Sequence, residues 1–301
     1  LPTIVRMVEK GFELSEASHA PVMLELRVRA CHVTGAFAAK TNRASAKSGL
    51  NRIDGPPRFD YARLAHPPLT FVQEKLKIDE RLPAAQAFAR AHKLNELFDG
   101  DLKDVGIVVL GGLTNTVLRA LARLGLADNF GEARIPIYCL NLAYPLLPDE
   151  LKTFCLGKRD VLIVEEGFPD YIEQAANAEL RRADIQTRIH GKGALPKAGE
   201  YTGEVMLRGI ANFIRDAKPA GLDAAAIAAK ADAVLGHKPL AAKSVGDIPP
   251  RPPNFCTGCP ERPVFAALKL TQREIGRTHI STDIGCHSFA TFAPFSMGNS
   301  I

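Results

Sequence analysis

Long apolar runs are missing from this 301-residue sequence, and no stretch is long enough to span a bilayer. Its 38 lysines and arginines barely exceed its 33 aspartates and glutamates, and nowhere do they gather with interleaved aromatic residues, which excludes a nucleic-acid patch. With six cysteines, the chain is also too poor in cysteine for a secreted disulfide scaffold. We therefore expect a cytoplasmic protein without a membrane or nucleic-acid partner.

Several common catalytic motifs are also absent. The chain has no Ser-His-Asp arrangement with a nucleophile elbow and no His-Glu-x-x-His. Gly111-Gly112 follows an apolar run but lacks the full Gly-x-Gly-x-x-Gly pattern, so it indicates a tight turn rather than a phosphate cradle. Glu165 and Glu166 offer at most one functional carboxylate, because neighbouring side chains on a strand point in opposite directions.

What the sequence does contain is a regular alternation of apolar runs and helical patterns. Strands are expected at Val105–Leu110, Ile135–Leu140, Val161–Val164 and Ile185–Ile189. Helices are expected at Asn115–Leu126, from Pro148 onward, and at Asp170–Leu180, Glu204–Ile214 and Asp223–Leu235. Such an alternation is typical of a parallel sheet covered on both faces, so the fold class is α/β, with several domains built on open parallel sheets.

The segments on either side of this pattern suggest further domains. Residues 2–18 have helical spacing, Val22–Val28 alternates like a strand, and residues 71–99 resume a helical pattern. After a proline-rich stretch, a helix is expected at Glu261–Glu274 and a strand at Thr278–Thr282. The expected organisation is therefore the end of one domain (1–35), a connector with a helix (36–89), a complete α/β domain (90–235), a linker (236–253) and the start of another domain (254–301). The missing initial Met and the apolar end suggest a piece of a longer polypeptide.

The cysteines carry the clearest chemical signal. Cys256-Thr257-Gly258-Cys259 places two thiols three positions apart in a turn, and Cys286 follows an expected strand, so the three sulfurs are expected at one edge of a sheet. On spacing alone this is half a zinc site, half an iron–sulfur site, a redox disulfide or a structural turn. His287 is a poor fourth zinc ligand, because adjacent residues rarely point the same way. A cluster whose fourth cysteine lies beyond Ile301 fits better.

These residues resemble a known family. Asn254-Phe255-Cys256-Thr257-Gly258-Cys259-Pro260-Glu261-Arg262 resembles the segment that opens the thiamine diphosphate-binding domain of indolepyruvate ferredoxin oxidoreductases, alpha subunit. Ser281-Thr282-Asp283-Ile284-Gly285-Cys286-His287 resembles that family's Asp-Ile-Gly-Cys-Tyr segment. The sequence departs from the pattern at Thr257, where proline is usual, at Glu261, where histidine is usual, and at His287, where tyrosine is typical.

The resemblance extends to the domains and cofactors. Residues 1–35 look like the end of a pyrimidine-binding domain, and residues 90–235 like a transketolase C-terminal-like domain. The resemblance implies that Cys256, Cys259 and Cys286 are ligands of a 4Fe-4S cluster, and that Gly258, Asp283, Gly285 and His287 contact thiamine diphosphate and Mg²⁺. The family's Gly-Asp-Gly motif and its activating glutamate are expected outside the chain, so this piece alone is expected to bind neither cofactor.

The implied reaction is the oxidative decarboxylation of aryl 2-oxoacids such as indolepyruvate, with coenzyme A accepting the acyl group and ferredoxin the electrons. A gamma or beta subunit, or a fused equivalent, and homo-oligomers are the implied partners. Two alternatives remain open at this stage. One is another thiamine-dependent 2-oxoacid dehydrogenase or transketolase-like enzyme; the other is a non-catalytic structural or dimerisation module.

Overall fold

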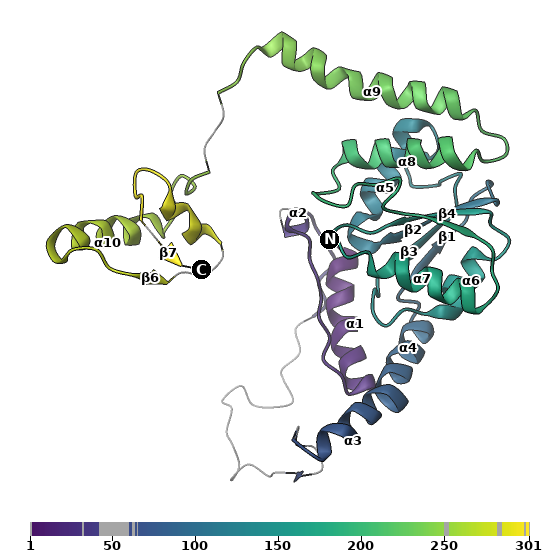
Figure 1. Cartoon of the computed structure of the whole chain (residues 1–301), viewed down its shortest axis with the longest axis horizontal. Coiled ribbons are helices and arrows are strands. Elements are labelled where there is room, and N and C mark those ends of the chain that lie inside the picture. The colour runs from purple at the N-terminus through teal and green to yellow at the C-terminus, as the bar shows by residue number, and fades with distance from the viewer. Residues whose placement is uncertain are drawn as a thin grey trace. The chain divides into compact units, whose positions relative to one another are not determined.

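The chain folds into two compact units, Leu1–His237 and Lys238–Ile301. The structure, a computed structural model, describes residues 2–31, 33–41, 60–61, 64, 66–249, 253–281, 285–297 and 299–300 (Figure 1). In the part of the chain that it describes, no helix is long and apolar enough to cross a membrane. The five segments expected from the sequence remain a prediction.

The first unit is built on a five-stranded sheet with strand order β1-β3-β2-β4-β5. The strands are β1 (Glu96–Phe98), β2 (Val105–Leu110), β3 (Ile137–Leu140), β4 (Asp160–Val164) and β5 (Arg188–His190). Strands β2 to β5 pair in parallel, with Ile107 opposite Ile137 in β3 and Leu162 in β4, whereas β1 pairs antiparallel with β3. The predicted α/β class with an open parallel sheet is therefore confirmed, with one antiparallel edge strand added.

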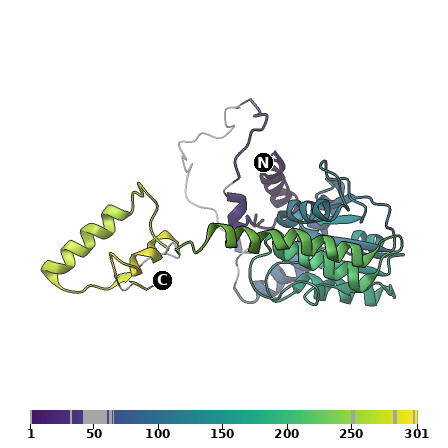
Figure 2. The same cartoon turned by 90° about the horizontal axis from the view of Figure 1, so that it is seen from above.

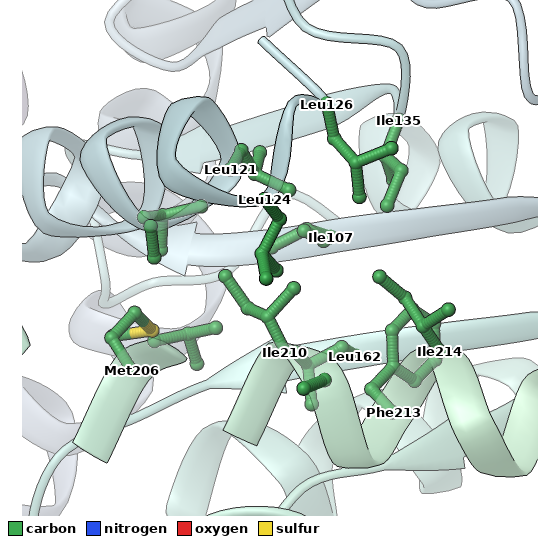
Figure 3. Close-up of a cluster of buried hydrophobic side chains, with 14 of the residues drawn as sticks. Ile107, Leu121, Leu124, Leu126, Ile135, Leu162, Met206, Ile210, Phe213 and Ile214 are labelled. Carbon is green, nitrogen blue, oxygen red and sulfur yellow. The ribbon is translucent and has the colours of Figure 1, made fainter. Parts of the chain in front are cut away.

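Residues in a strand alternate between the two faces of a sheet, so the apolar side chains of this sheet point to both faces. Helices cover both of them. On one face, Ile107 and Val109 pack with α5 (Thr114–Leu124), α8 (Gly203–Ala217) and α9 (Ala224–Val245) in the larger core, which Figure 3 shows. Only residues 224–235 of α9 belong to this core, and Figure 2 shows that part of the helix from above. On the other face, Val108 packs with α6 (Pro148–Cys155) and α7 (Tyr171–Arg182).

The N-terminal part of the first unit is helical. It contains α1 (Pro2–Ser18), α2 (Val28–Cys31), α3 (Leu69–Leu76), the π-helical turn η2 (Lys77–Arg81) and α4 (Leu82–Ala91). Leu14 of α1 is buried against Ala85 and Ala89 of α4 and against Leu147, which fixes α1 to the rest of the unit. The short turn η3 (Gly111–Leu113) joins β2 to α5.

Two local predictions in this part were wrong. The strand expected at Val22–Val28 is absent: residues 21–27 are irregular, and α2 begins at Val28. Alternating side chains form a strand only where a neighbouring strand satisfies the backbone, and none pairs with this segment among the described residues. The helix expected over residues 71–99 ends at Ala91, and Glu96–Phe98 instead pairs with β3.

The second unit has a small aromatic core. Its elements are α10 (Arg262–Ile275), β6 (Ile280–Ser281), the 3-10 turn η4 (Cys286–Thr291) and β7 (Asn299–Ser300), with β6 and β7 parallel. Phe255 stacks on Phe265 with ring centroids 5.3 Å apart and meets Phe295 edge-on at 5.6 Å. Cys259 packs against this cluster, so the aromatic rings position the cysteine turn.

Candidate functional site

The Cys256–Cys259 turn is a folded loop in the second unit. The Cys259 N–H donates to the Cys256 carbonyl at 3.1 Å, and Gly258 sits at φ +74°, a conformation that glycine adopts without strain. Arg262 Nη2 donates to the carbonyls of Phe255, at 2.7 Å, and of Cys256, at 2.9 Å. The first turn of α10 therefore holds the cysteine loop by its backbone and leaves both thiols unbonded to each other.

The Cys286 segment lies beside this loop. His287 Nε2 is 3.3 Å from the Glu261 carboxylate, and its ring meets Phe265 edge-on at 5.6 Å. Since Glu261 follows Cys259 by two positions and His287 follows Cys286 directly, these contacts join the two cysteine segments. The structure thus brings the two segments together through residues that flank the cysteines.

The thiols themselves do not form a ready-made cluster site. Cys256 and Cys286 are exposed free thiols, and Cys259 is half-buried. Within the described ranges, no three His, Cys, Asp or Glu side chains are grouped as a metal ion requires. The assignment of Cys256, Cys259 and Cys286 as ligands therefore remains a prediction.

The predicted thiamine contacts are described only in part. Gly258 forms the bend of the cysteine loop, and Gly285 directly precedes η4. The His287 ring already contacts Glu261 and Phe265. Asp283 lies outside the described residues. The assignment of these four residues to the cofactor also stays a prediction.

A second group of polar residues lies at the carboxyl edge of the sheet in the first unit. The buried Glu165, just after β4, accepts the N–H groups of Ile172, at 3.0 Å, and of Glu173, at 3.1 Å, at the start of α7. A carboxylate at this place stabilises the helix N-terminus. Glu166 turns elsewhere, and Arg27 binds it at 2.7 Å. The two adjacent carboxylates thus act separately, and each has a structural partner.

The glycine pair at the end of β2 serves close packing. A Cβ on Gly111 would lie 2.5 Å from Asn141 Oδ1 and 3.6 Å from Asn141 Cα, so a side chain here would displace the Asn141 amide. Asn141 Nδ2 in turn donates to the Leu94 carbonyl at 2.8 Å and to Glu96 at 3.0 Å. These contacts favour the interpretation of Gly111-Gly112 as a tight turn.

Lys192 and Tyr201 complete this edge, and no sequence motif pointed to them. Lys192 Nζ donates to the Glu165 carbonyl and, at 2.9 Å, to the Tyr201 hydroxyl. Burial lowers the pKa of Lys192, against the attraction of Glu165 and Glu173. Burial and the nearby carboxylates raise the pKa of Tyr201 to about 12. The network fixes the loop after β5 to the end of β4.

Comparison with known proteins agrees with the family resemblance of the cysteine segments. The IorA subunit of indolepyruvate oxidoreductase from Methanothermobacter thermautotrophicus is 29% identical over 99% of this chain and 45% of its own length. The chain resembles IorA subunits along almost its whole length. The IorA subunit from Pyrococcus horikoshii is 26% identical over 98% of this chain and 43% of its own length. The resemblance predicted from the sequence is therefore confirmed. The chain spans less than half the length of these IorA relatives.

Other comparisons add little. No family model matches the chain. A 2-oxoglutarate:ferredoxin oxidoreductase from Magnetococcus marinus superposes with a TM-score of 0.35 at 18% identity, covering 48% of this chain and 23% of that protein. A likeness at that level carries no argument about fold or function.

Proposed function

We propose that this chain is part of the alpha subunit of a ferredoxin-dependent 2-oxoacid oxidoreductase that acts on aryl 2-oxoacids such as indolepyruvate. The similarity to IorA subunits over 99% of the chain carries the proposal. The adjacency of the two cysteine segments, joined by Glu261 and His287, supports it independently of those names. The enzyme passes the acyl group to coenzyme A and works in the cytoplasm with a gamma or beta subunit, or a fused equivalent, as a homo-oligomer.

The cofactors belong to the proposal as well. Bound thiamine diphosphate with Mg²⁺ supplies the decarboxylation chemistry, and a 4Fe-4S cluster takes part in electron transfer to ferredoxin. Cys256, Cys259 and Cys286 are the proposed cluster ligands in the full-length enzyme. In this chain, Arg262 and the aromatic core hold the first two cysteines in position, and the Glu261–His287 pair brings the third segment to them.

Iron and sulfide analysis of the full-length enzyme, purified without oxygen, tests the ligand assignment. Cys259→Ala should lower the iron and sulfide content by the equivalent of one cluster. Cys31→Ala is the control, because Cys31 is also a free thiol but lies in the first unit. An unchanged cluster content in Cys259→Ala would show that these cysteines serve another purpose.

The reaction is tested separately, by ferredoxin reduction in the presence of indolepyruvate and coenzyme A. The full-length enzyme should reduce ferredoxin only when all three substrates are present. Turnover with a lipoyl or sugar acceptor but not with ferredoxin would instead support another thiamine-dependent enzyme. The two outcomes distinguish the proposed oxidoreductase from the dehydrogenase or transketolase alternative.

For the chain by itself, a non-catalytic structural role is the second candidate. It is favoured by the finding that the three thiols are not grouped as ligands in the described part of the chain. Calorimetric titration of this chain with thiamine diphosphate and Mg²⁺ should show no heat of binding. Measurable binding would contradict this candidate and show that the piece assembles a cofactor site unaided.

A further inference from the structure

At the carboxyl edge of the first unit's sheet, a side chain from the N-terminal part of the same chain contacts the loops after β2 and β4. The strand order reverses at β2, since β3 lies on one side of it and β4 on the other. In open α/β sheets, ligands bind outside the carboxyl ends of the strands at such a reversal. Here, Arg27 lies between Gly112, which follows β2, and Glu166, which follows β4.

The contact with Glu166 is a paired one. Arg27 Nη2 donates to Oε2 at 2.7 Å and Nε donates to Oε1 at 3.2 Å, while Glu200 lies 3.7 Å from the same guanidinium. The two side chains of the pair are only 22% and 28% exposed, so solvent screens them less than a surface pair. Paired guanidinium–carboxylate contacts of this kind fix direction as well as distance.

The stem of Arg27 also covers the glycine loop. A Cβ on Gly112 would lie 3.1 Å from Arg27 Cδ and 3.4 Å from Cγ, so the stem lies directly on the backbone after β2. Glu166 is itself held in place, because its Oε2 accepts the Tyr201 N–H at 2.5 Å. One arginine therefore spans the loops that follow two adjacent parallel strands.

Several apolar side chains of this segment are exposed. Chain direction reverses at His19, which has φ +52°, and the Ser15 hydroxyl donates to the Ala20 carbonyl at 2.8 Å. Beyond Ala20, Met23 is 87% exposed, and Val22, Leu24 and Leu26 are exposed as well. The segment runs back beside α1 and reaches the sheet edge at α2 (Figure 1). Arg27 attaches this segment to Glu166, which follows β4.

We propose that residues 20–31 form a strap across the carboxyl edge of the sheet, and that the Arg27–Glu166 pair holds the strap closed. With the pair intact, the chain itself covers the loops after β2 and β4. When the pair breaks, residues 21–27 detach, and the loops after β2 and β4 are uncovered. This device is independent of the proposed enzymatic activity, since it concerns only contacts within the first unit.

Limited proteolysis of the whole chain with chymotrypsin tests the proposal. Cleavage after Met23, Leu24 or Leu26 requires several residues of detached chain, so its rate reports the population of the open strap. Arg27→Ala and Glu166→Gln should each raise this rate at least fivefold. The double variant should raise it no further than the larger single effect, because both changes break the same contact.

Arg6→Ala is the matched control. It removes another N-terminal arginine with a sheet partner, Glu96 at 3.7 Å, and should leave strap cleavage unchanged. Cleavage at the exposed Phe71 in α3 gives an internal reference that should not move in any variant. Thermal unfolding of each variant separates local release from global loss of structure.

Two outcomes would overturn the strap. One is Arg27→Ala and Glu166→Gln both cleaved at the wild-type rate; the other is a rise that Arg6→Ala shares. If Arg27→Ala fails to fold, Glu166→Gln and Arg27→Lys decide the matter. Arg27→Lys keeps the charge but loses the paired geometry, so it should give an intermediate rate. Cleavage of the strap at the wild-type rate in both Glu166→Gln and Arg27→Lys would equally contradict the proposal.

Discussion

His287 Nε2 lies 3.3 Å from the carboxylate of Glu261, so a residue beside Cys286 contacts a residue beside the Cys256–Cys259 loop. The contact connects the two cysteine segments, because Glu261 follows the Cys256–Cys259 loop and His287 directly follows Cys286.

The first prediction concerns this contact. His287→Ala removes both the pair with Glu261 and the edge contact with Phe265, and should destabilise the second unit by about 1–2 kcal/mol. His287→Phe keeps a ring against Phe265 and should cost only about 0.5 kcal/mol. Hydrogen exchange of α10 measures both effects in the whole chain. Equal protection of α10 in His287→Ala and the wild type would show that the contact does not stabilise the unit.

The second prediction concerns a buried hydroxyl in the first unit. Tyr138 donates to Glu150 at 2.8 Å and accepts from Asn95 at 3.0 Å, and burial followed by Glu150 raises its pKa, so it stays protonated. Tyr138→Phe leaves both partners short of a hydrogen bond and should cost about 1–3 kcal/mol in urea unfolding. Tyr171→Phe, at a ring that is 68% exposed, should change stability little. Equal losses in the two variants would refute the role of the buried bond.

Much of the sheet could be predicted because its strands are buried on both faces. Val105–Leu110 is predicted and observed with the same bounds, and Val161–Val164 begins only one residue earlier in the structure. Edge elements were harder. Glu96–Phe98 becomes a strand only through pairing with β3, and residues 22–27 have strand-like alternation but no such partner among the described residues. The apolar pattern of a segment indicates whether that segment is buried, whereas strand pairing depends on residues that are far away in the sequence.

The candidate site was predictable to a similar degree. The cysteine spacing identified the loop that Arg262 and Gly258 shape. The contacts of Arg27 with Glu166 could not be inferred, because 139 residues separate the partners and neither belongs to a motif. Lys192 was missed for the same reason. The contacts of Lys192 depend on its burial, which is defined only in the folded chain.

The third prediction concerns acid stability. The buried Asp160 accepts from Arg159 Nε at 2.6 Å and pairs with His190 Nε2 at 2.7 Å. Burial opposes ionisation of this carboxyl, but the hydrogen bonds from Arg159 and His190 outweigh it and lower its pKa below the usual 3.8. A lowered carboxyl pKa contributes stability that is fully present above the unfolded value and is lost as the pH falls through the folded value.

Asp160→Asn should therefore cost about 2–4 kcal/mol at pH 7, because it weakens two charge-assisted contacts. The difference from the wild type should shrink as the pH falls below about 4. Urea unfolding of both proteins between pH 3 and pH 7 measures this difference in stability. Asp101→Asn is the control, since that carboxylate pairs with Arg134 on the surface and should matter little. A difference that stays constant across the whole range would contradict the role of the Asp160 charge.

The last prediction concerns the six thiols. Cys139 and Cys155 are buried, and burial raises the pKa of both, that of Cys155 to about 12. The thiolate is the reactive form, so at pH 8 a disulfide reagent should modify the exposed Cys31, Cys256 and Cys286 at least a hundredfold faster than these two. Mass mapping of modified peptides over time measures each rate, and the half-buried Cys259 should fall between the groups. Labelling of Cys155 as fast as Cys256 in folded protein would show that α6 opens locally. Saturation of all six thiols in urea provides the endpoint against which each rate is normalised.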